Sequence, residues 1–135
     1  MLALRIVGPA AAVTSWRYDA FSQGDMTALS EILAKDVTHH VPGSHPLAGD
    51  HKGLTAVLGY YQQLGVETAG SFRVEVRQLF ADGRGHVMSV HHATAERGGK
   101  KLDADGGIMF KIVGEKVTDL DECVEDLDIG NDFWA

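Results

Sequence analysis

The chain has a single cysteine, three prolines and a shortage of basic residues. Because Cys123 stands alone, no intrachain disulfide can form, which is typical of a reducing compartment. Lysine and arginine total 12 against 19 aspartate and glutamate residues, for a net charge of −7. This balance argues against nucleic acid or an anionic membrane as a partner, because both attract basic surfaces. We therefore expect a cytoplasmic protein with neither kind of partner.

Long apolar runs are also lacking. The N-terminal stretch MLALRIVGPAAAV is interrupted by Arg5 and Pro9 and is too short to span a bilayer, so we interpret residues 1–12 as a loose leader. The composition, 44% hydrophobic and 23% charged over 135 residues, is typical of one globular domain. No repeat or linker divides the chain, and we expect residues 1–135 to form a single domain.

The first half has the apolar spacing of amphipathic helices. Three segments carry apolar residues along one helical face: residues 13–23, 26–35 and 54–64. Gly24 and Gly65 end two of these helices, since glycine accepts the left-handed conformation, and Asp25 caps the second. A short strand, residues 37–41, is predicted before the third helix.

In the second half, helical spacing gives way to alternation. Four segments alternate apolar and polar residues and are predicted strands: residues 72–80, 86–96, 101–113 and 117–124. Turn dipeptides such as Asp82-Gly83 and Gly98-Gly99 separate them, so successive strands are expected to run antiparallel. Helices followed by such a meander predict an α+β fold, with a bent sheet wrapped around the helices and a hollow at its open end.

Local motifs add a family resemblance to this order of elements. Residues 20–25 read AFSQGD at the end of the first helix, and residues 40–43 read HVPG at the end of the first strand. Further motifs are LAG at 47–49 and DFW at 132–134. In order and spacing these motifs resemble the SnoaL-like, ketosteroid isomerase-like branch of the nuclear transport factor 2-like superfamily.

The resemblance implies a cone-shaped fold, in which three N-terminal helices pack on a strongly curved, mostly antiparallel sheet and enclose a pocket. It also implies a small apolar ligand, no cofactor, and a homodimer formed through the convex face of the sheet. The superfamily includes isomerases, cyclases, dehydratases and hydrolases as well as proteins without known activity, so fold alone leaves the reaction open. Isomerase chemistry is not carried over, because His40 or Val41 stands in place of its carboxylate base and Ile108 in place of its buried aspartic acid.

Two histidines are catalytic candidates, because imidazole exchanges protons near neutral pH. His40 closes the first strand; its alternative role is that of a hydrogen-bonded residue that shapes the Pro42-Gly43 turn. His91 and His92 are neighbours on one strand, so their side chains point to opposite faces. We favour His92 as the inward one; the alternative is a satisfied polar residue at the pocket or the dimer interface.

Two carboxylates complete the catalytic candidates, Asp105 and Asp121. A buried Asp105 would have a raised pKa, and the neighbouring Gly106 and Gly107 would let a ligand approach. On the last strand either Asp121 or Glu122 points inward, and two nearby carboxylates push their pKa values apart. The alternatives are an exposed strand edge at Asp105 and a solvated charged face on the last strand.

Aromatic residues at helical and strand spacing either line the cavity or fill the core. The ligand-binding candidates are Trp16, Tyr18, Tyr60, Phe72 and Phe110. The four histidines within residues 37–53 lack the spacing of a metal motif, so no metal site is expected. Three functions stay open: an acid–base enzyme acting on a small apolar or polycyclic molecule, a non-catalytic dimeric protein that binds a ligand or partner, and a purely structural dimerisation module.

Overall fold

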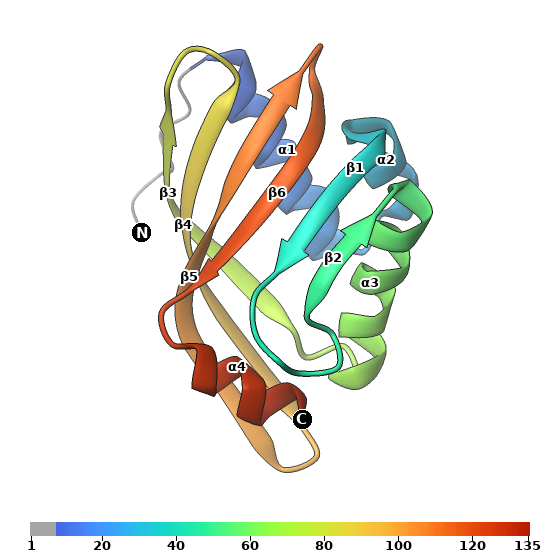
Figure 1. Ribbon diagram of the computed structural model, residues 1–135, viewed down its shortest axis with the longest axis vertical. Helices are drawn as coiled ribbons and strands as arrows, with labels where there is room; N and C mark the ends of the chain where they lie inside the picture. Colours follow the sequence, from blue (N-terminus) through green and yellow to red (C-terminus); the bar gives the residue numbers. More distant parts are fainter. Residues whose placement is uncertain (1–7) are drawn as a thin grey trace.

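The computed structural model describes residues 8–135 and confirms the predicted α+β fold, with helices packed on one face of a curved sheet (Figure 1). Six strands form an open sheet in the order β2-β1-β6-β5-β4-β3; within it only β1 and β6 pair in parallel. The elements in chain order are α1 (Pro9–Gln23), α2 (Met26–Ile32), β1 (Leu33–Val41), β2 (Gly49–Lys52), α3 (Leu54–Glu67), β3 (Arg73–Ala81), β4 (His86–Arg97), β5 (Lys100–Val113), β6 (Lys116–Val124) and α4 (Leu127–Trp134).

Helix α1 begins earlier than the sequence predicted. Residues 1–7 of the expected leader lie outside the described part of the chain, but residues 9–12 are helical. Pro9 suits the first helical position, where the N–H that proline lacks would have no partner inside the helix. Gly24 ends the helix with φ 63°, and the carboxylate of Asp25 accepts a hydrogen bond from the Ala28 N–H to cap α2, as predicted.

Two elements were not predicted, and one boundary moves. Helix α2 ends at Ile32, so the segment from Leu33 onward, including Lys35, belongs to strand β1. Strand β2 pairs with the end of β1. It is only four residues long, which is too short for an alternation of apolar and polar residues to be recognised. The C-terminal motif lies in α4, which crosses the end of the sheet beside the β4–β5 hairpin (Figure 1).

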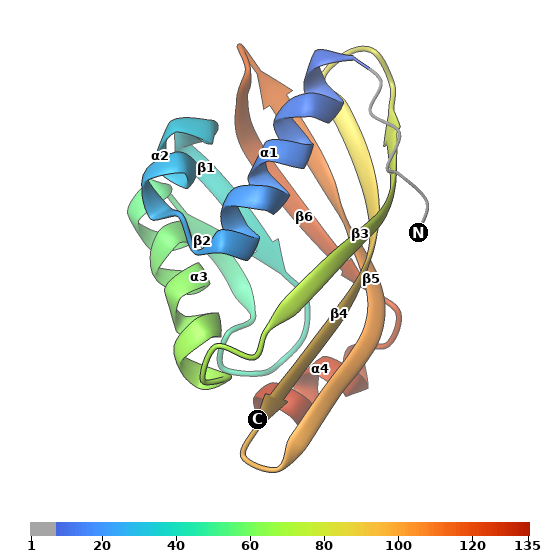
Figure 2. The same ribbon diagram turned by 180° about the vertical axis from the view of Figure 1, so that it is seen from behind.

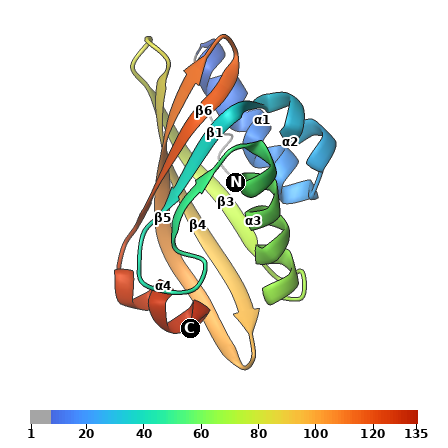
Figure 3. The same ribbon diagram turned by 45° about the vertical axis from the view of Figure 1, so that its right-hand side comes forward.

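The helices and the sheet form two layers with the core between them. Seen from behind, α1 lies across the sheet (Figure 2), and a side view shows α1, α2 and α3 on one face, with α4 near the tip of the β4–β5 hairpin (Figure 3). Helices and strands both contribute fully buried side chains, among them Leu29, Val37, Val57, Val87 and Leu120. Their burial fixes which face of each strand points inward.

The sheet bends at the centre of the β4–β5 pair. Here the hydroxyl of Ser89, a side chain of β4, bonds both the N–H (2.8 Å) and the carbonyl (3.2 Å) of Ile108. A Cβ atom added to Gly107 would lie 2.1 Å from the Ser89 carbonyl oxygen, so this close approach requires glycine. Register shifts in the β3–β4 and β5–β6 pairs add to the curvature.

Candidate functional site

A cavity of about 90 Å³ lies between the concave face of the sheet and the helices α1, α3 and α4. Strand alternation brings polar side chains into it, because residues that share a face with buried apolar ones also point inward. On β1 the inward residues are Val37, His39 and Val41, and on β6 Glu122 shares the inner face with Leu120. The polar residues that line the cavity are Arg17, Tyr18, His39, His45, Tyr60, Tyr61, His91, Asp105, Glu122 and Asp126.

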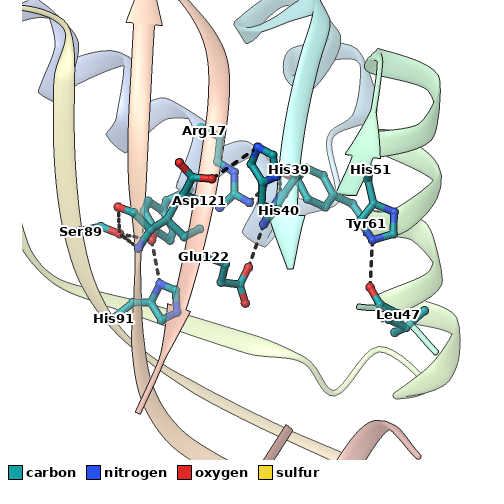
Figure 4. Close-up of polar contacts among 12 residues, drawn as sticks. Arg17, His39, His40, Leu47, His51, Tyr61, Ser89, His91, Asp121 and Glu122 are labelled. Carbon is teal, nitrogen blue, oxygen red and sulfur yellow. Dashed lines mark hydrogen bonds and ion pairs between the residues drawn. The ribbon is translucent and has the colours of Figure 1, made fainter. Parts of the chain in front are cut away.

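Four of these residues form a relay of hydrogen bonds (Figure 4). Arg17 Nη2 lies 2.8 Å from the Tyr61 hydroxyl, which lies 3.0 Å from His39 Nδ1. His39 Nε2 lies 2.8 Å from Glu122 Oε1. Since a guanidinium only donates and a carboxylate only accepts, Arg17 donates to Tyr61, Tyr61 donates to neutral His39, and His39 Nε2–H donates to Glu122.

The pKa values agree with this arrangement. Burial alone would raise the pKa of Glu122, but the hydrogen bond and charge of His39, with smaller effects of His91 and Arg17, lower it below the ordinary value of 4.5. Burial lowers the pKa of His39 below 6.5, against the opposing effect of Glu122. At neutral pH the relay therefore holds a carboxylate and a neutral imidazole.

A second polar group reaches the same cavity from α1 and β4. The Tyr18 hydroxyl lies 2.7 Å from both Ser89 Oγ and His91 Nδ1. Burial raises the pKa of Tyr18 to about 12 and lowers that of His91 below 6.5. His91 is therefore neutral at pH 7, and its other ring nitrogen faces Gly106, where an added Cβ atom would lie 3.2 Å away.

The structure places His40 and Asp121 on the outer face of the sheet, which corrects the expectation that they face the pocket. His40 Nδ1 lies 2.6 Å from Asp50 Oδ1, and its Nε2 lies 3.4 Å from Asp121 Oδ1. Glu122 is thus the carboxylate of β6 that points inward, and His39 the histidine of β1. In both places the residue that lines the cavity is the one next to the predicted residue: His39 instead of His40, and Glu122 instead of Asp121.

The preference for His92 as the inward histidine is wrong for the same reason. Its ring lies on the outer face between two carboxylates, 2.5 Å from Asp103 and 2.7 Å from Asp105. The hydrogen bond to Asp105 raises the pKa of His92, and His92 in turn lowers the pKa of Asp105. The raised pKa expected of a buried Asp105 therefore does not occur, since its carboxylate is on the surface even though the residue borders the cavity.

The five predicted aromatic residues divide between the cavity, the core and the surface. Tyr18, Tyr60 and Phe72 line the cavity. Phe110 is 1% exposed and belongs to the core, where its ring packs against Tyr18 at a centroid distance of 5.7 Å. Trp16 is 56% exposed on the outside of α1. Among residues 8–135, no three His, Cys, Asp or Glu side chains have an arrangement that could hold a metal ion.

The sequence-based predictions missed Arg17 and His39, and they did not decide between Asp121 and Glu122 as the inward carboxylate of β6. The alternation of β1 and β6 contained the signal for two of these residues, because His39 lies between Val37 and Val41, and Glu122 between Leu120 and Val124. A buried arginine on a helix leaves no such pattern, since helix α1 has apolar residues around most of its circumference.

Comparison with known proteins places this geometry in a family. The profile of the SnoaL-like domain matches residues 15–120. The uncharacterised protein Rv0034 of Mycobacterium tuberculosis (strain ATCC 25618 / H37Rv) is 31% identical over 118 residues, which cover 87% of this chain and 90% of that protein.

Solved structures of other proteins have the same fold. Bal32a, from a soil-derived mobile gene cassette, superposes with a TM-score of 0.92 at 35% identity, covering 94% of this chain and 97% of its own. An NTF2-like protein of Burkholderia xenovorans LB400 has a TM-score of 0.79 at 22% identity over 94% of this chain and 96% of its own.

The chain has the fold of NTF2-like proteins, in which helices and a curved sheet surround a cavity. The chain belongs to the SnoaL-like domain family. Within residues 8–135, no helix is both long enough and apolar enough to cross a membrane.

Proposed function

We propose that this protein is an enzyme that binds a small, largely apolar molecule inside the cone and moves a proton on it. The observation that carries the proposal is the convergence of two hydrogen-bonded pairs, Glu122–His39 and His91–Tyr18, on one cavity. Figure 4 shows His39, His91 and Glu122. The negative charge of Glu122 raises the pKa of His91 against the effect of burial, which indicates that the two side chains lie near each other. A paired base and proton carrier beside an apolar wall is the arrangement that isomerisation, cyclisation, dehydration and hydration require.

Glu122 is the proposed general base. Its Oε1 accepts a hydrogen bond from His39, and no hydrogen bond joins its Oε2 to another residue within 8–135, so that oxygen can take a proton from a ligand. His39 holds the carboxylate in place and is itself oriented by Tyr61. A ligand that displaces water from the cavity strengthens the effect of burial and raises the pKa of Glu122, which makes it a better base.

His91 is the proposed second proton carrier. Its Nδ1 is held by the Tyr18 hydroxyl, and its Nε2 borders the cavity beside Gly106. Because the ring is neutral at pH 7, Nε2 can accept a proton or, in the other tautomer, donate one to an oxygen of the ligand.

One observation favours the non-catalytic alternative, in which the cone only binds its ligand. The lowered pKa of Glu122 makes its carboxylate a weak base before a ligand enters. A carrier protein would keep the cavity and its aromatic wall without turning the ligand over.

Hydrogen–deuterium exchange of ligand C–H groups separates the two functions. Incubating the protein in D₂O with cyclic ketones, β-keto esters and epoxides, followed by NMR and mass spectrometry, detects proton abstraction or ring opening without knowledge of the natural substrate. We expect Glu122→Gln to lower the rate at least about 100-fold, because the amide has no basic oxygen.

His40→Gln is the matched control, since it removes an imidazole from the adjacent outer face and should leave the rate within about twofold. Equal rates for the wild type and Glu122→Gln, with any of these compounds that reacts, would contradict the role given to Glu122. Binding without any exchange or turnover would favour the carrier.

A further inference from the structure

Arg17 is a buried cation whose hydrogen bonding is incomplete. The residue is 3% exposed and lines the cavity. Its Nη2 donates to the Tyr61 hydroxyl at 2.8 Å, but its Nε–H is buried without a partner among the described residues. No carboxylate of residues 8–135 lies within ion-pair distance of its guanidinium. Buried arginine is normally paired, because an unpaired buried charge is costly.

The surroundings of Arg17 compensate for only part of its desolvation. Its guanidinium carbon lies 4.9 Å from the ring centres of both Phe21 and Tyr61 and 5.1 Å from that of Tyr18. Such contacts favour a cation, but they provide no acceptor for the buried, in-plane Nε–H. Glu122 is the counter-charge at the far end of the relay, separated from Arg17 by Tyr61 and His39.

We propose that Arg17 anchors an oxyanion of the ligand, so that the cone selects apolar molecules that carry a carboxylate or an enolate-like oxygen. The guanidinium presents several N–H donors in one plane, which matches the two oxygens of a carboxylate. The aromatic rings around it suit a flat apolar body attached to that group. This inference rests on the cavity being the ligand site of the proposed function, but it does not depend on turnover.

The position of Arg17 relative to Glu122 gives the anchor a chemical use. An oxyanion held by Arg17 fixes one end of the ligand, while Glu122 and His91 approach it from the sheet. If the ligand is a ketone, the same guanidinium stabilises the negative charge that develops on its oxygen as Glu122 removes a proton.

Two isosteric probes test the anchor, 2-naphthoate and 2-naphthamide, which share an apolar body and differ in charge. Isothermal titration calorimetry at pH 7 should show the wild type binding naphthoate about tenfold or more tightly than naphthamide. Arg17→Met, which keeps much of the side-chain volume, should abolish this preference by weakening naphthoate alone. Arg17→Lys should retain part of it, because charge remains while the planar donors are lost.

Two control variants separate the anchor from the base and from general damage. Glu122→Gln should bind naphthoate at least as tightly as the wild type, since it removes a like charge, even if it abolishes proton exchange. His40→Gln should match the wild type with both probes.

The inference is overturned if the wild type binds both probes equally or binds neither, or if Arg17→Met weakens both alike. If circular dichroism shows that Arg17→Met does not fold, the affinities of the two probes for the wild type and for Arg17→Lys still decide whether Arg17 binds the oxyanion.

Discussion

At the scale of single residues, the role of each titratable side chain depends on the face of the sheet that it occupies. Three adjacent pairs show this: His39 and His40, His91 and His92, and Asp121 and Glu122. One member of each pair enters the cavity, and the other forms ion pairs on the outside. In the His91–His92 pair, burial lowers the pKa of His91, and the hydrogen bond to Asp105 raises the pKa of His92.

His39 and His91 should titrate below pH 6.5, and His92 above it. Burial lowers the pKa of His39 and His91 below 6.5, whereas the bond to Asp105 raises that of His92 above it. Following the imidazole C–H resonances by NMR from pH 4.5 to 8.5, with His91→Gln and His92→Gln for assignment, measures each value. A midpoint for His91 above that of His92 would contradict the structure.

The same pKa differences set the pH dependence of stability. For His39 and His91 the folded pKa lies below the unfolded one, so their contribution is full above pH 6.5 and is lost as the pH falls through the folded value. A tenfold difference in proton affinity between the folded and unfolded chains corresponds to about 1.4 kcal/mol in the free energy of unfolding. Urea denaturation at pH 7 and pH 5 should therefore show a loss at pH 5 that is smaller in His91→Gln than in the wild type.

The inward position of His39 and Glu122 was predictable from the sequence, whereas that of His91 was not. Val37 and Val41 flank His39 on its own face of β1, and on an open sheet the more apolar face is usually the buried one. Strand β4 has apolar residues on both faces: Val87 is buried, but Met88 is also large and apolar and lies outside. Alternation then no longer identifies the inner face, which is why His92 was preferred.

At the scale of elements, α4 forms one wall of the cavity. Leu127, Ile129 and Trp134 line the cavity from this helix. The hairpin tip of β4 and β5 holds the end of α4, because Arg97 Nη1 donates to the carbonyls of Phe133 (3.1 Å) and Ala135 (2.9 Å). The short length of α4 explains why it could not be predicted: eight residues show too few turns of a helical pattern.

Removing the Arg97 side chain should loosen α4 without unfolding the sheet. Charge-assisted hydrogen bonds contribute about 1.5–3 kcal/mol, so the amides of Leu127–Trp134 should exchange with deuterium about tenfold or more faster in Arg97→Ala. Hydrogen–deuterium exchange by mass spectrometry measures this. Lys101→Ala is the control, because Lys101 is highly exposed and makes only a 3.8 Å pair with Glu96. Unchanged exchange in Arg97→Ala would show that Arg97 does not hold the helix.

Two glycine-to-alanine changes should have opposite effects on stability. Gly59 lies inside α3 with open space around its Cβ position. Because alanine has the higher helix propensity, Gly59→Ala should raise the free energy of unfolding by about 0.8–1 kcal/mol. At Gly107 the new Cβ would meet the Ser89 carbonyl oxygen at 2.1 Å, so Gly107→Ala should cost several kcal/mol or prevent folding. Urea denaturation measures both; a stabilising Gly107→Ala would contradict the close β4–β5 approach.

At the scale of the whole molecule, the outer face of the sheet has its own apolar row. Phe80, Met88 and Met109 are paired across β3, β4 and β5, so their side chains lie side by side on that face. They are 46%, 44% and 41% exposed, respectively. The sequence resemblance led us to expect a homodimer through the convex face, and we propose that this row is the centre of that interface, because exposed apolar patches mark surfaces that associate.

Met109→Glu tests the interface, because two like charges brought together at a symmetric contact repel each other and lose their water. We expect light scattering after gel filtration to give twice the chain mass for the wild type and the mass of one chain for the variant. Lys111→Glu, a charge change two residues along the same outer face of β5, is the control and should leave the mass unchanged if the contact is centred on the apolar row. The cavity opens on the other face of the sheet, so monomeric Met109→Glu should still bind 2-naphthoate as the wild type does. A monomeric wild type, or a dimer that survives Met109→Glu, would place any association elsewhere on the molecule.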